Sequence, residues 1–327
     1  MATKKTPAAP ATTKSATKKS APTPAAKKAA AASQAPEPVD RPTAKDMKQH
    51  AQKLPYPAKQ ADMNLQPAMN FSTYRAAGKL QDKVALITGA DSGIGRAVAV
   101  AFAMEGAHVA VLYNENTADA EETKRLVEAQ DRRCLLLQLD VRDPEQCKQA
   151  VRLTRKELGN LNILVNNAAY QMAQEKFEEI SEEQIRRTFD TNILGYIWMA
   201  QAAIPHLHKN DCIINTGSIV GLTGIPLLID YSCTKSAIHA LTKSLATYLG
   251  EKGIRVNCVV PGPVWTPNIP GTMPREEIEK FGYEVALARP GQPEELAPAY
   301  VLLASQDGSF MTGSLVHVTG GKMSSDQ

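Results

Sequence analysis

The sequence is poor in cysteine and aromatic residues, and none of its apolar runs is long. Its five cysteines are widely spaced and form no CxxC pair, so neither a disulfide framework nor a zinc site is predicted. The histidines do not form a metal-binding pattern with any acidic residue, so no catalytic metal is predicted. No run reaches the roughly 18 apolar residues that span a bilayer, and the N-terminus lacks the apolar core of a secretory signal. We therefore expect a reduced, cytoplasmic protein without membrane contact.

Residues 1–33 lack acidic, aromatic and branched aliphatic side chains. After Met1 they contain only Ala, Lys, Thr, Pro and Ser, which bury too little apolar surface to offset the entropic cost of ordering. The whole chain has a formal net charge of +3, but seven of its lysines lie in residues 1–33. The rest of the chain has 30 Lys and Arg against 34 Asp and Glu, so its formal net charge is −4. We predict a disordered tail that either keeps the protein soluble or contacts nucleic acid or another polyanion; nucleic-acid binding is not expected of the rest.

Residues 34–80 form a second N-terminal segment with many prolines and scattered apolar side chains. The pattern predicts an extended arm that lies on the folded body, with a plain linker as the alternative, and a helix only near residues 43–52. Prolines stand at positions 36, 38, 42, 55, 57 and 67, and the apolar side chains are Met47, Leu54, Tyr56, Met63, Leu65, Met69, Phe71 and Tyr74.

From residue 83, short apolar runs alternate with helix-length segments. This alternation predicts parallel strands joined by right-handed helical crossovers, with strands buried on both faces. The fold class is therefore α/β, a single doubly wound (Rossmann) domain over residues 81–327 with a seven-stranded parallel sheet. The seven runs are VALIT (84–88), HVAVLY (108–113), CLLLQL (134–139), NILVN (162–166), CIINTG (212–217), IRVNCVV (254–260) and SLVHVT (314–319).

Helix starts are marked by capping residues. Asp143 before Pro144 predicts an N-cap followed by proline at the first helical position, and Ser181 begins a sequence with capping-box spacing. Apolar residues then recur at intervals of three and four, which predicts one long helix over residues 181–209 that Pro205 kinks or ends.

A glycine-rich turn follows the first predicted strand, since residues 88–95 read TGADSGIG before a helical run. Such a turn lets backbone amides approach a pyrophosphate, and the helix dipole favours its negative charge. Glycines between a strand and a helix are also common in turns that bind nothing, so this pattern alone leaves both interpretations open.

Further motifs give the sequence a family resemblance. The glycines Gly89, Gly93 and Gly95 have TGxxxGxG spacing, residues 166–169 read NNAA where the family has NNAG, and residues 231–235 match YxxxK. With PGPVWT at residues 261–266, the sequence resembles the short-chain dehydrogenase/reductase family over residues 81–322. Within that family it is most similar to the glucose and ribitol dehydrogenase-like oxidoreductases.

The resemblance implies a nicotinamide dinucleotide as cofactor. The glycine turn would hold the pyrophosphate, the ends of the second and third strands would hold the adenosine, and the YxxxK and PG segments would hold the nicotinamide side. The implied cofactor-binding residues are Gly89, Ser92, Gly93, Ile94, Gly95, Tyr113, Asn114, Asp140, Val141, Asn167, Tyr231, Lys235, Val264 and Thr266.

The choice between NAD and NADP depends on the adenosine end. Relatives that prefer NAD have an acidic residue where Tyr113 stands, whereas relatives that prefer NADP have Arg or Lys near Asn114 or at Ser92. This sequence has neither, and Glu115 would repel a 2′-phosphate. NAD(H) is therefore favoured, with NADP(H) possible.

The implied catalytic residues are Tyr231, Lys235, Ser218 and Asn192. Tyr231 and Lys235 are four residues apart on a predicted helix, so they share a face, and a neighbouring ammonium is expected to lower the pKa of a tyrosine toward a useful range. By spacing alone the pair could also lie on a solvated helix face. Ser218, thirteen residues before Tyr231, would hold the substrate oxygen, with Thr216 as the alternative hydroxyl. In the family, the asparagine at Asn192 helps to hold a water in a proton relay through the lysine.

We therefore expect an oxidoreductase that transfers a hydride between a nicotinamide dinucleotide and a small alcohol, polyol or sugar, or the corresponding carbonyl. The alternative is a non-catalytic dinucleotide-binding or scaffold protein whose basic tail contacts a polyanion. The resemblance also implies a homodimer or homotetramer that associates through the helices containing Asn192 and Tyr231. It further implies a mobile substrate lid over residues 262–289, for which an ordinary connecting loop is the alternative.

Overall fold

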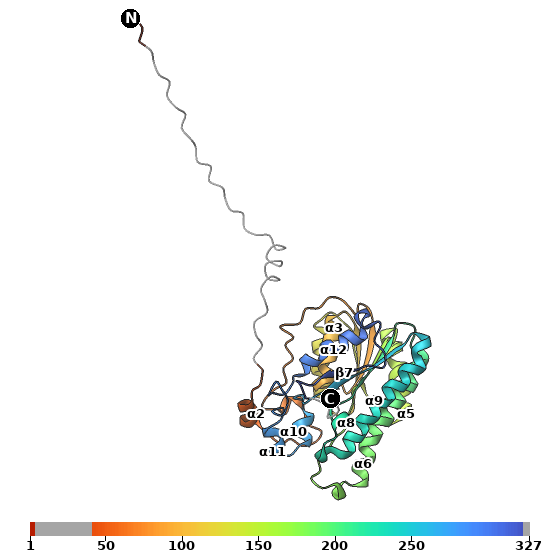
Figure 1. The fold of residues 1–327 in the computed structure, drawn as a ribbon. Coiled ribbons are helices and arrows are strands. Elements are labelled where there is room, and N and C mark those ends of the chain that lie inside the picture. The colour runs from red at the N-terminus through yellow and green to blue at the C-terminus, as the bar shows by residue number, and fades with distance from the viewer. Residues whose placement is uncertain (4–40, 323–327) are drawn as a thin grey trace. The chain divides into compact units, whose positions relative to one another are not determined.

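The computed structural model describes residues 1–3 and 41–322, so most of the predicted tail and the first residues of the predicted arm lie outside the described residues (Figure 1).

Seven parallel strands form one sheet in the order β3-β2-β1-β4-β5-β6-β7, which confirms the predicted doubly wound fold. The order reverses between β1 and β4, and open α/β sheets bind ligands beyond the carboxyl ends of strands at such a switch point. The strands are β1 (Val84–Thr88), β2 (His108–Tyr113), β3 (Cys134–Gln138), β4 (Ile163–Asn166), β5 (Cys212–Thr216), β6 (Arg255–Pro261) and β7 (Leu315–Val318).

Helices cover both faces of the sheet. Alternate residues of β1 point to opposite faces, with Ala85 and Ile87 in one core cluster and Val84 and Leu86 in the other. The first face is covered by α3 (Gly93–Met104), α4 (Thr117–Glu128) and α12 (Pro293–Ala304), and the second by α5 (Pro144–Leu158), α7 (Gly195–Ala203) and α9 (Ile229–Leu249). In Figure 1, α3 and α12 lie together, apart from α5 and α9. The shorter helices are α2 (Ala44–His50), α6 (Glu182–Phe189), α8 (Val220–Thr223), α10 (Asn268–Thr272) and α11 (Arg275–Glu279).

The predicted helix caps are present. The Asp143 carboxylate accepts hydrogen bonds from the amides of Glu145 and Gln146 at the start of α5, and the Ser181 hydroxyl accepts one from the Gln184 amide at the start of α6.

The single long helix predicted over residues 181–209 is interrupted. A π turn, η3 (Asp190–Leu194), separates α6 from α7, and the segment ends in a 3₁₀ turn, η4 (Ile204–His206), at Pro205. Asn192 explains the interruption, because its side chain both accepts from the Tyr170 amide (2.8 Å) and donates to the Tyr170 carbonyl (2.9 Å). These bonds hold the π turn against the loop after β4. Apolar periodicity along the sequence does not predict such a contact.

The described part of the arm, residues 41–80, packs along the domain. Met47 of α2 and Met63 are buried in a cluster with Trp265 and Ile278, and the Trp265 indole donates to the Leu65 carbonyl at 2.8 Å. Further along, the Glu105 carboxylate accepts hydrogen bonds from the arm, including the amides of residues 77 and 79. A 3₁₀ turn, η1 (Gln60–Asp62), lies between these two regions.

Candidate active site

One cleft of about 360 Å³ lies at the carboxyl ends of the central strands. It brings together all the predicted site residues except Gly95 and Asn192, which lie behind its wall. The predicted cofactor and catalytic residues that line it are Gly89, Ser92, Gly93, Ile94, Tyr113, Asn114, Asp140, Val141, Asn167, Ser218, Tyr231, Lys235, Val264 and Thr266.

The glycine turn is packed too closely for side chains. A Cβ atom at Gly95 would lie 2.2 Å from the Gly89 carbonyl oxygen, and one at Gly89 would lie 2.8 Å from the Cα of Ala168. Asn167 holds the turn, since its side-chain amide donates to the carbonyls of Thr88 (3.0 Å) and Gly89 (2.9 Å). The turn therefore presents backbone at the N-terminus of α3, as an anion site requires.

Two arginines that the sequence patterns did not indicate lie near Asp140, where the adenosine is predicted to bind. Arg142 and Arg187 both line the cleft. Arg142 donates hydrogen bonds of 2.5 to 3.0 Å to both carboxylate oxygens of Asp140. Burial alone would raise the pKa of Asp140, but these bonds and the charge of Arg142 lower it overall. The Asp140 carboxylate, predicted to help hold the adenosine, is thus also an ion-pair partner.

The predicted catalytic residues Ser218, Tyr231 and Lys235 also line the cleft. The Lys235 ammonium lies 5.3 Å from the centre of the Tyr231 ring and donates to the Thr216 carbonyl at 2.8 Å. Burial lowers the pKa of Lys235 to about 8. Tyr231 and Lys235 therefore both line the cleft, as expected of side chains that share one face of a helix.

The expected lowering of the Tyr231 pKa by Lys235 is wrong for this structure. Burial raises the pKa of Tyr231, and a hydrogen bond with Ser218 is the influence that acts in the opposite direction. The physical reason is that Lys235 is directed at the Thr216 carbonyl and is itself desolvated, so burial of the phenol dominates.

The two candidate hydroxyls differ in their surroundings. Thr216 has its hydroxyl 2.8 Å from that of the buried Tyr300, whereas Ser218 interacts with Tyr231. This contrast favours Ser218 as the group that faces a substrate.

Asn192 contacts the active site through its neighbours. Besides its bonds to Tyr170, it donates to the Thr234 hydroxyl at 3.0 Å, one residue before Lys235. Because it lies in the π turn and is fully buried, it links the loop after β4 to α9.

The opposite end of the cleft is largely apolar. Side chains from α10, from the residues before and after α11, and from the segment between α8 and α9 line it. Those at positions 269, 273 and 281 belong to the predicted lid. These residues are Ile225, Leu228, Ile269, Met273 and Phe281, with Gln171, Glu284 and Lys322 as polar neighbours.

Three arm residues also line the cleft, Tyr56, Pro57 and Ala58. Sequence reasoning placed the arm on the body but assigned it no part in the site. The only local signal was an aromatic residue between two prolines, which does not say where the segment lies.

Neither a metal-binding cluster nor a membrane-spanning helix is present among the described residues. In residues 1–3 and 41–322, no group of three or more His, Cys, Asp and Glu side chains is placed to hold a metal ion. No helix in the same ranges combines the length and apolar character needed to cross a membrane.

Comparison with known proteins agrees with this geometry. A family model described as enoyl-(acyl carrier protein) reductase matches residues 89–323, from the glycine turn to the end of the sheet. The chain belongs to the short-chain dehydrogenase/reductase family. The resemblance predicted from the sequence motifs is therefore confirmed, and with it membership of an oxidoreductase family.

Similar curated sequences extend over most of this short-chain dehydrogenase/reductase chain. It is 49% identical to the uncharacterized oxidoreductase YhdF of Bacillus subtilis, over 87% of this chain and 98% of that one. It is 44% identical to the glucose and ribitol dehydrogenase of Daucus carota (81% and 93% covered). It is 42% identical to the chloroplastic NADPH-dependent aldehyde reductase 1 of Arabidopsis thaliana (85% and 98%).

Similar solved structures include complexes with both dinucleotides. A short-chain dehydrogenase from Burkholderia cenocepacia, in complex with NADP, has a TM-score of 0.70 at 31% identity and covers 74% of this chain and 98% of its own. One from Mycobacterium paratuberculosis, bound to NAD, has a TM-score of 0.68 at 31% identity with the same coverage.

Proposed function

We propose that this protein is an NAD(P)-dependent oxidoreductase that interconverts a small alcohol, polyol or sugar and the corresponding carbonyl, with Tyr231 as general acid and base. The observation that supports this most is that Ser218, Tyr231 and Lys235 line the same cleft as the glycine turn. This supports the proposal, because a turn suited to bind a phosphate and a group suited to transfer a proton line one groove.

The residues present fit a nicotinamide dinucleotide. The glycine turn leaves no room for a Cβ at Gly95, so the backbone at the start of α3 stays accessible. Asn114, Val141, Val264 and Thr266 all line the cleft. The first two would hold the adenosine, and the last two would hold the nicotinamide side. When bound, the dinucleotide would supply the hydride acceptor or donor.

The chain's own residues would manage the substrate oxygen and its proton. In alcohol oxidation, a deprotonated Tyr231 takes the hydroxyl proton while Ser218 donates a hydrogen bond to the same oxygen. Because burial raises the pKa of Tyr231, the positive charge of a bound oxidised nicotinamide would have to favour this form. As the hydride leaves the carbon for the nicotinamide, the carbon–oxygen double bond forms. In carbonyl reduction the Tyr231 hydroxyl returns the proton. Lys235 keeps its ammonium beside the tyrosine, and Asn192 acts as a positioning residue behind it.

NAD(H) is the preferred coenzyme in this proposal. Glu115 lies at the adenosine end of the cleft, where its charge would repel a 2′-phosphate. The two arginines there have other partners, since Arg142 pairs with Asp140, and Arg187 lies over the rings of Tyr56 and Tyr170. The names of the relatives include an NADPH-dependent enzyme, so both coenzymes belong in the test.

The experiment is a panel of sugars, polyols and short aldehydes assayed with both coenzymes by nicotinamide absorbance. We expect turnover of a member of the panel, with kcat/KM higher for NAD(H) than for NADP(H). Tyr231→Phe should lower kcat by about 100-fold or more, the usual contribution of general acid–base catalysis, and leave coenzyme affinity unchanged.

The matched control is Tyr248→Phe, because Tyr248 is on the same helix but is 66% exposed. It should behave as the wild type. Near-normal turnover by Tyr231→Phe would refute the assignment of Tyr231, and a higher kcat/KM with NADP(H) would refute the coenzyme preference.

A further inference from the structure

We propose that arm residues 56–60 form a strap across the dinucleotide cleft, and that Gln60 is a positioning residue for the glycine turn, so that the strap slows coenzyme release. The inference rests on the proposed coenzyme site and adds to it a segment that lies outside the family-model match at residues 89–323.

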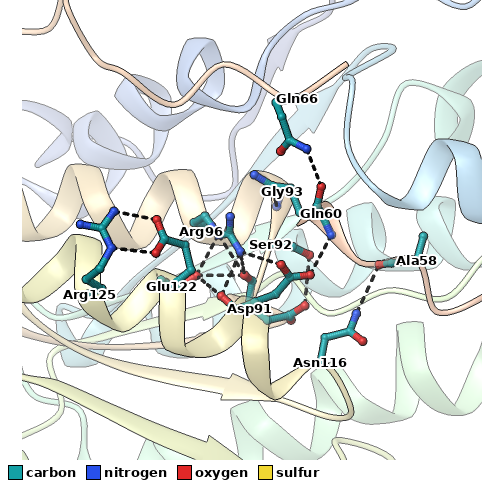
Figure 2. A network of polar contacts seen from close by, with 12 residues as sticks. Ala58, Gln60, Gln66, Asp91, Ser92, Gly93, Arg96, Asn116, Glu122 and Arg125 are labelled. Carbon is teal, nitrogen blue, oxygen red and sulfur yellow. Dashed lines mark hydrogen bonds and ion pairs between the residues drawn. The ribbon is translucent and has the colours of Figure 1, made fainter. Parts of the chain in front are cut away.

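Gln60 makes the contact that joins the arm to the glycine turn. Its side-chain oxygen accepts a hydrogen bond from the Gly93 amide at 3.0 Å; both residues are labelled in Figure 2. Its backbone amide donates to the Asp119 carboxylate at 2.8 Å. Gln60 is 4% exposed, so both bonds are shielded from water. Gly93 is the first residue of α3, where an amide has no partner inside the helix.

Gln60 thus caps one amide of the turn from outside the cleft. Gly93 lines the cleft, whereas Gln60 does not. The first amide of this helix that bonds back to a preceding carbonyl is that of Arg96, which donates to the Ser92 oxygen. Holding the Gly93 amide therefore fixes the start of α3 and leaves the amides of Ile94 and Gly95 for an anion.

The bond is supported by a buried network beneath it. The Arg96 guanidinium donates to the Asp91 carbonyl at 2.7 Å (Figure 2). It also pairs with the Asp119 carboxylate at 3.2 Å. Asp119 therefore connects Gln60 of the arm to Arg96 of α3. A displacement of Gln60 would loosen groups on both sides of the turn.

The strap contacts both sides of the cleft. On the side of the glycine turn, the Asn116 side-chain amide donates to the Ala58 carbonyl at 3.2 Å (Figure 2). On the other side, the Tyr56 ring meets the Tyr170 ring edge-on at 5.3 Å between centroids, and the Arg187 guanidinium lies 5.2 Å from the Tyr56 centroid. A segment held at both edges of a groove must move for a long ligand beneath it to leave.

The arm also joins the strap to the segment predicted as a lid. The Leu54 amide donates to the Pro270 carbonyl at 2.9 Å, and the Lys53 ammonium donates to the Met273 carbonyl at 2.9 Å. The arm, including the strap, therefore connects the glycine turn to the predicted lid.

The test measures dissociation of NADH and NADPH from the full-length protein by stopped-flow fluorescence. Gln60→Met keeps the size of the side chain and removes the acceptor for Gly93. Gln52→Met is the matched control, because Gln52 bonds within the arm, to the Asp62 carbonyl and the Asn64 amide, and these two contacts do not involve the turn. Tyr56→Ala removes the contact on the other side.

We expect Gln60→Met to raise the dissociation rate constant about fivefold, which is the change expected from the loss of one hydrogen bond. The coenzyme Kd and KM should rise by the same factor. Tyr56→Ala should act in the same direction, and Gln52→Met should match the wild type. Coenzyme should also slow hydrogen exchange at residues 54–66 of the wild type.

Three results would overturn the strap. One is an unchanged dissociation rate in Gln60→Met and Tyr56→Ala, even if the melting temperature falls, because a merely structural role would affect stability alone. Another is tighter binding in Gln60→Met, because Gln60 would then compete with the pyrophosphate for the Gly93 amide. The third is no binding of either coenzyme by the wild type, which would also refute the proposed function.

Discussion

Lys235 is a charged side chain almost entirely removed from water, with 1% exposure. Its ammonium has the Thr216 carbonyl as partner, and burial lowers its pKa to about 8 from an ordinary value of 10.5. Such a group reduces the stability of the fold at neutral pH, because the protonated form must be buried. A proposed role beside Tyr231 gives a reason for keeping it there.

The pH dependence of folding stability tests this burial. The pKa of Lys235 is lower in the folded than in the unfolded chain, so between pH 8 and 10.5 the unfolded chain binds more protons and stability rises with pH. Relative to Lys235→Met, the wild type should gain on the order of 3 kcal/mol in unfolding free energy over this range. Below pH 8 the variant should be the more stable protein.

Urea unfolding at several pH values measures the difference. Lys243→Met is the control, since Lys243 is exposed on the same helix and should give a difference from wild type that does not depend on pH. A pH-independent difference for Lys235→Met would show that the ammonium is not desolvated in the folded protein.

At the level of secondary structure, β1, the glycine turn and α3 form the unit on which the cleft depends. The turn needs glycine for two separate reasons: Gly89 has a φ of 62°, and Gly95 lies against the backbone of Gly89. The first is a local conformational requirement, and the second is a close approach between two parts of the turn.

Gly95→Ala should therefore damage both the fold and coenzyme binding. The added Cβ would lie 2.2 Å from a backbone oxygen, which cannot rotate away, so we expect a loss of about 1–3 kcal/mol and no measurable coenzyme binding. Thermal unfolding and coenzyme titration measure the two effects. Gly250→Ala is the control, because no atom lies within 4 Å of its Cβ position and its φ is −56°. Unchanged coenzyme affinity in Gly95→Ala would contradict the packing argument.

At the level of the whole molecule, apolar side chains are exposed on the helices around the π turn. Phe189 and Leu194 remain 38% and 37% exposed, and Ile185 precedes them on α6 with similar exposure. Water is an unfavourable environment for such a row, and the family resemblance predicted association through the helices that contain Asn192 and Tyr231. We propose that this face is the contact between copies of the chain.

Phe189→Asp should then lower the mass of the protein in solution to that of a monomer. A charge in the contact would be desolvated without a partner, which costs several kcal/mol at each symmetric site. Size-exclusion chromatography with light scattering gives the mass, and Phe177→Asp, at a more exposed phenylalanine before α6, should leave it unchanged. An oligomer that survives Phe189→Asp, or a wild type that is already monomeric, would contradict the proposed contact.

The sequence by itself determined the features that depend on local order. Apolar runs and caps predicted all seven strands and the starts of α5 and α6, because burial on both faces and capping act within a few residues. The sequence likewise indicated the glycine turn and the Tyr231–Lys235 pair, both of which line the cleft. The glycine spacing is typical of a strand-to-helix turn, and a spacing of four residues puts two side chains on one helix face.

The tertiary structure decided which distant residues meet. It placed Arg142, Arg187 and Tyr56 in the cleft, joined Gln60 to Gly93, interrupted a helix at Asn192, and directed Lys235 at Thr216. Gln60 and Gly93 are 33 residues apart, and Tyr56 and Tyr170 are further still, so no local pattern encodes their contact. The pKa of Tyr231 is also decided by the tertiary structure, because it depends on how completely the packed chain excludes water from the phenol.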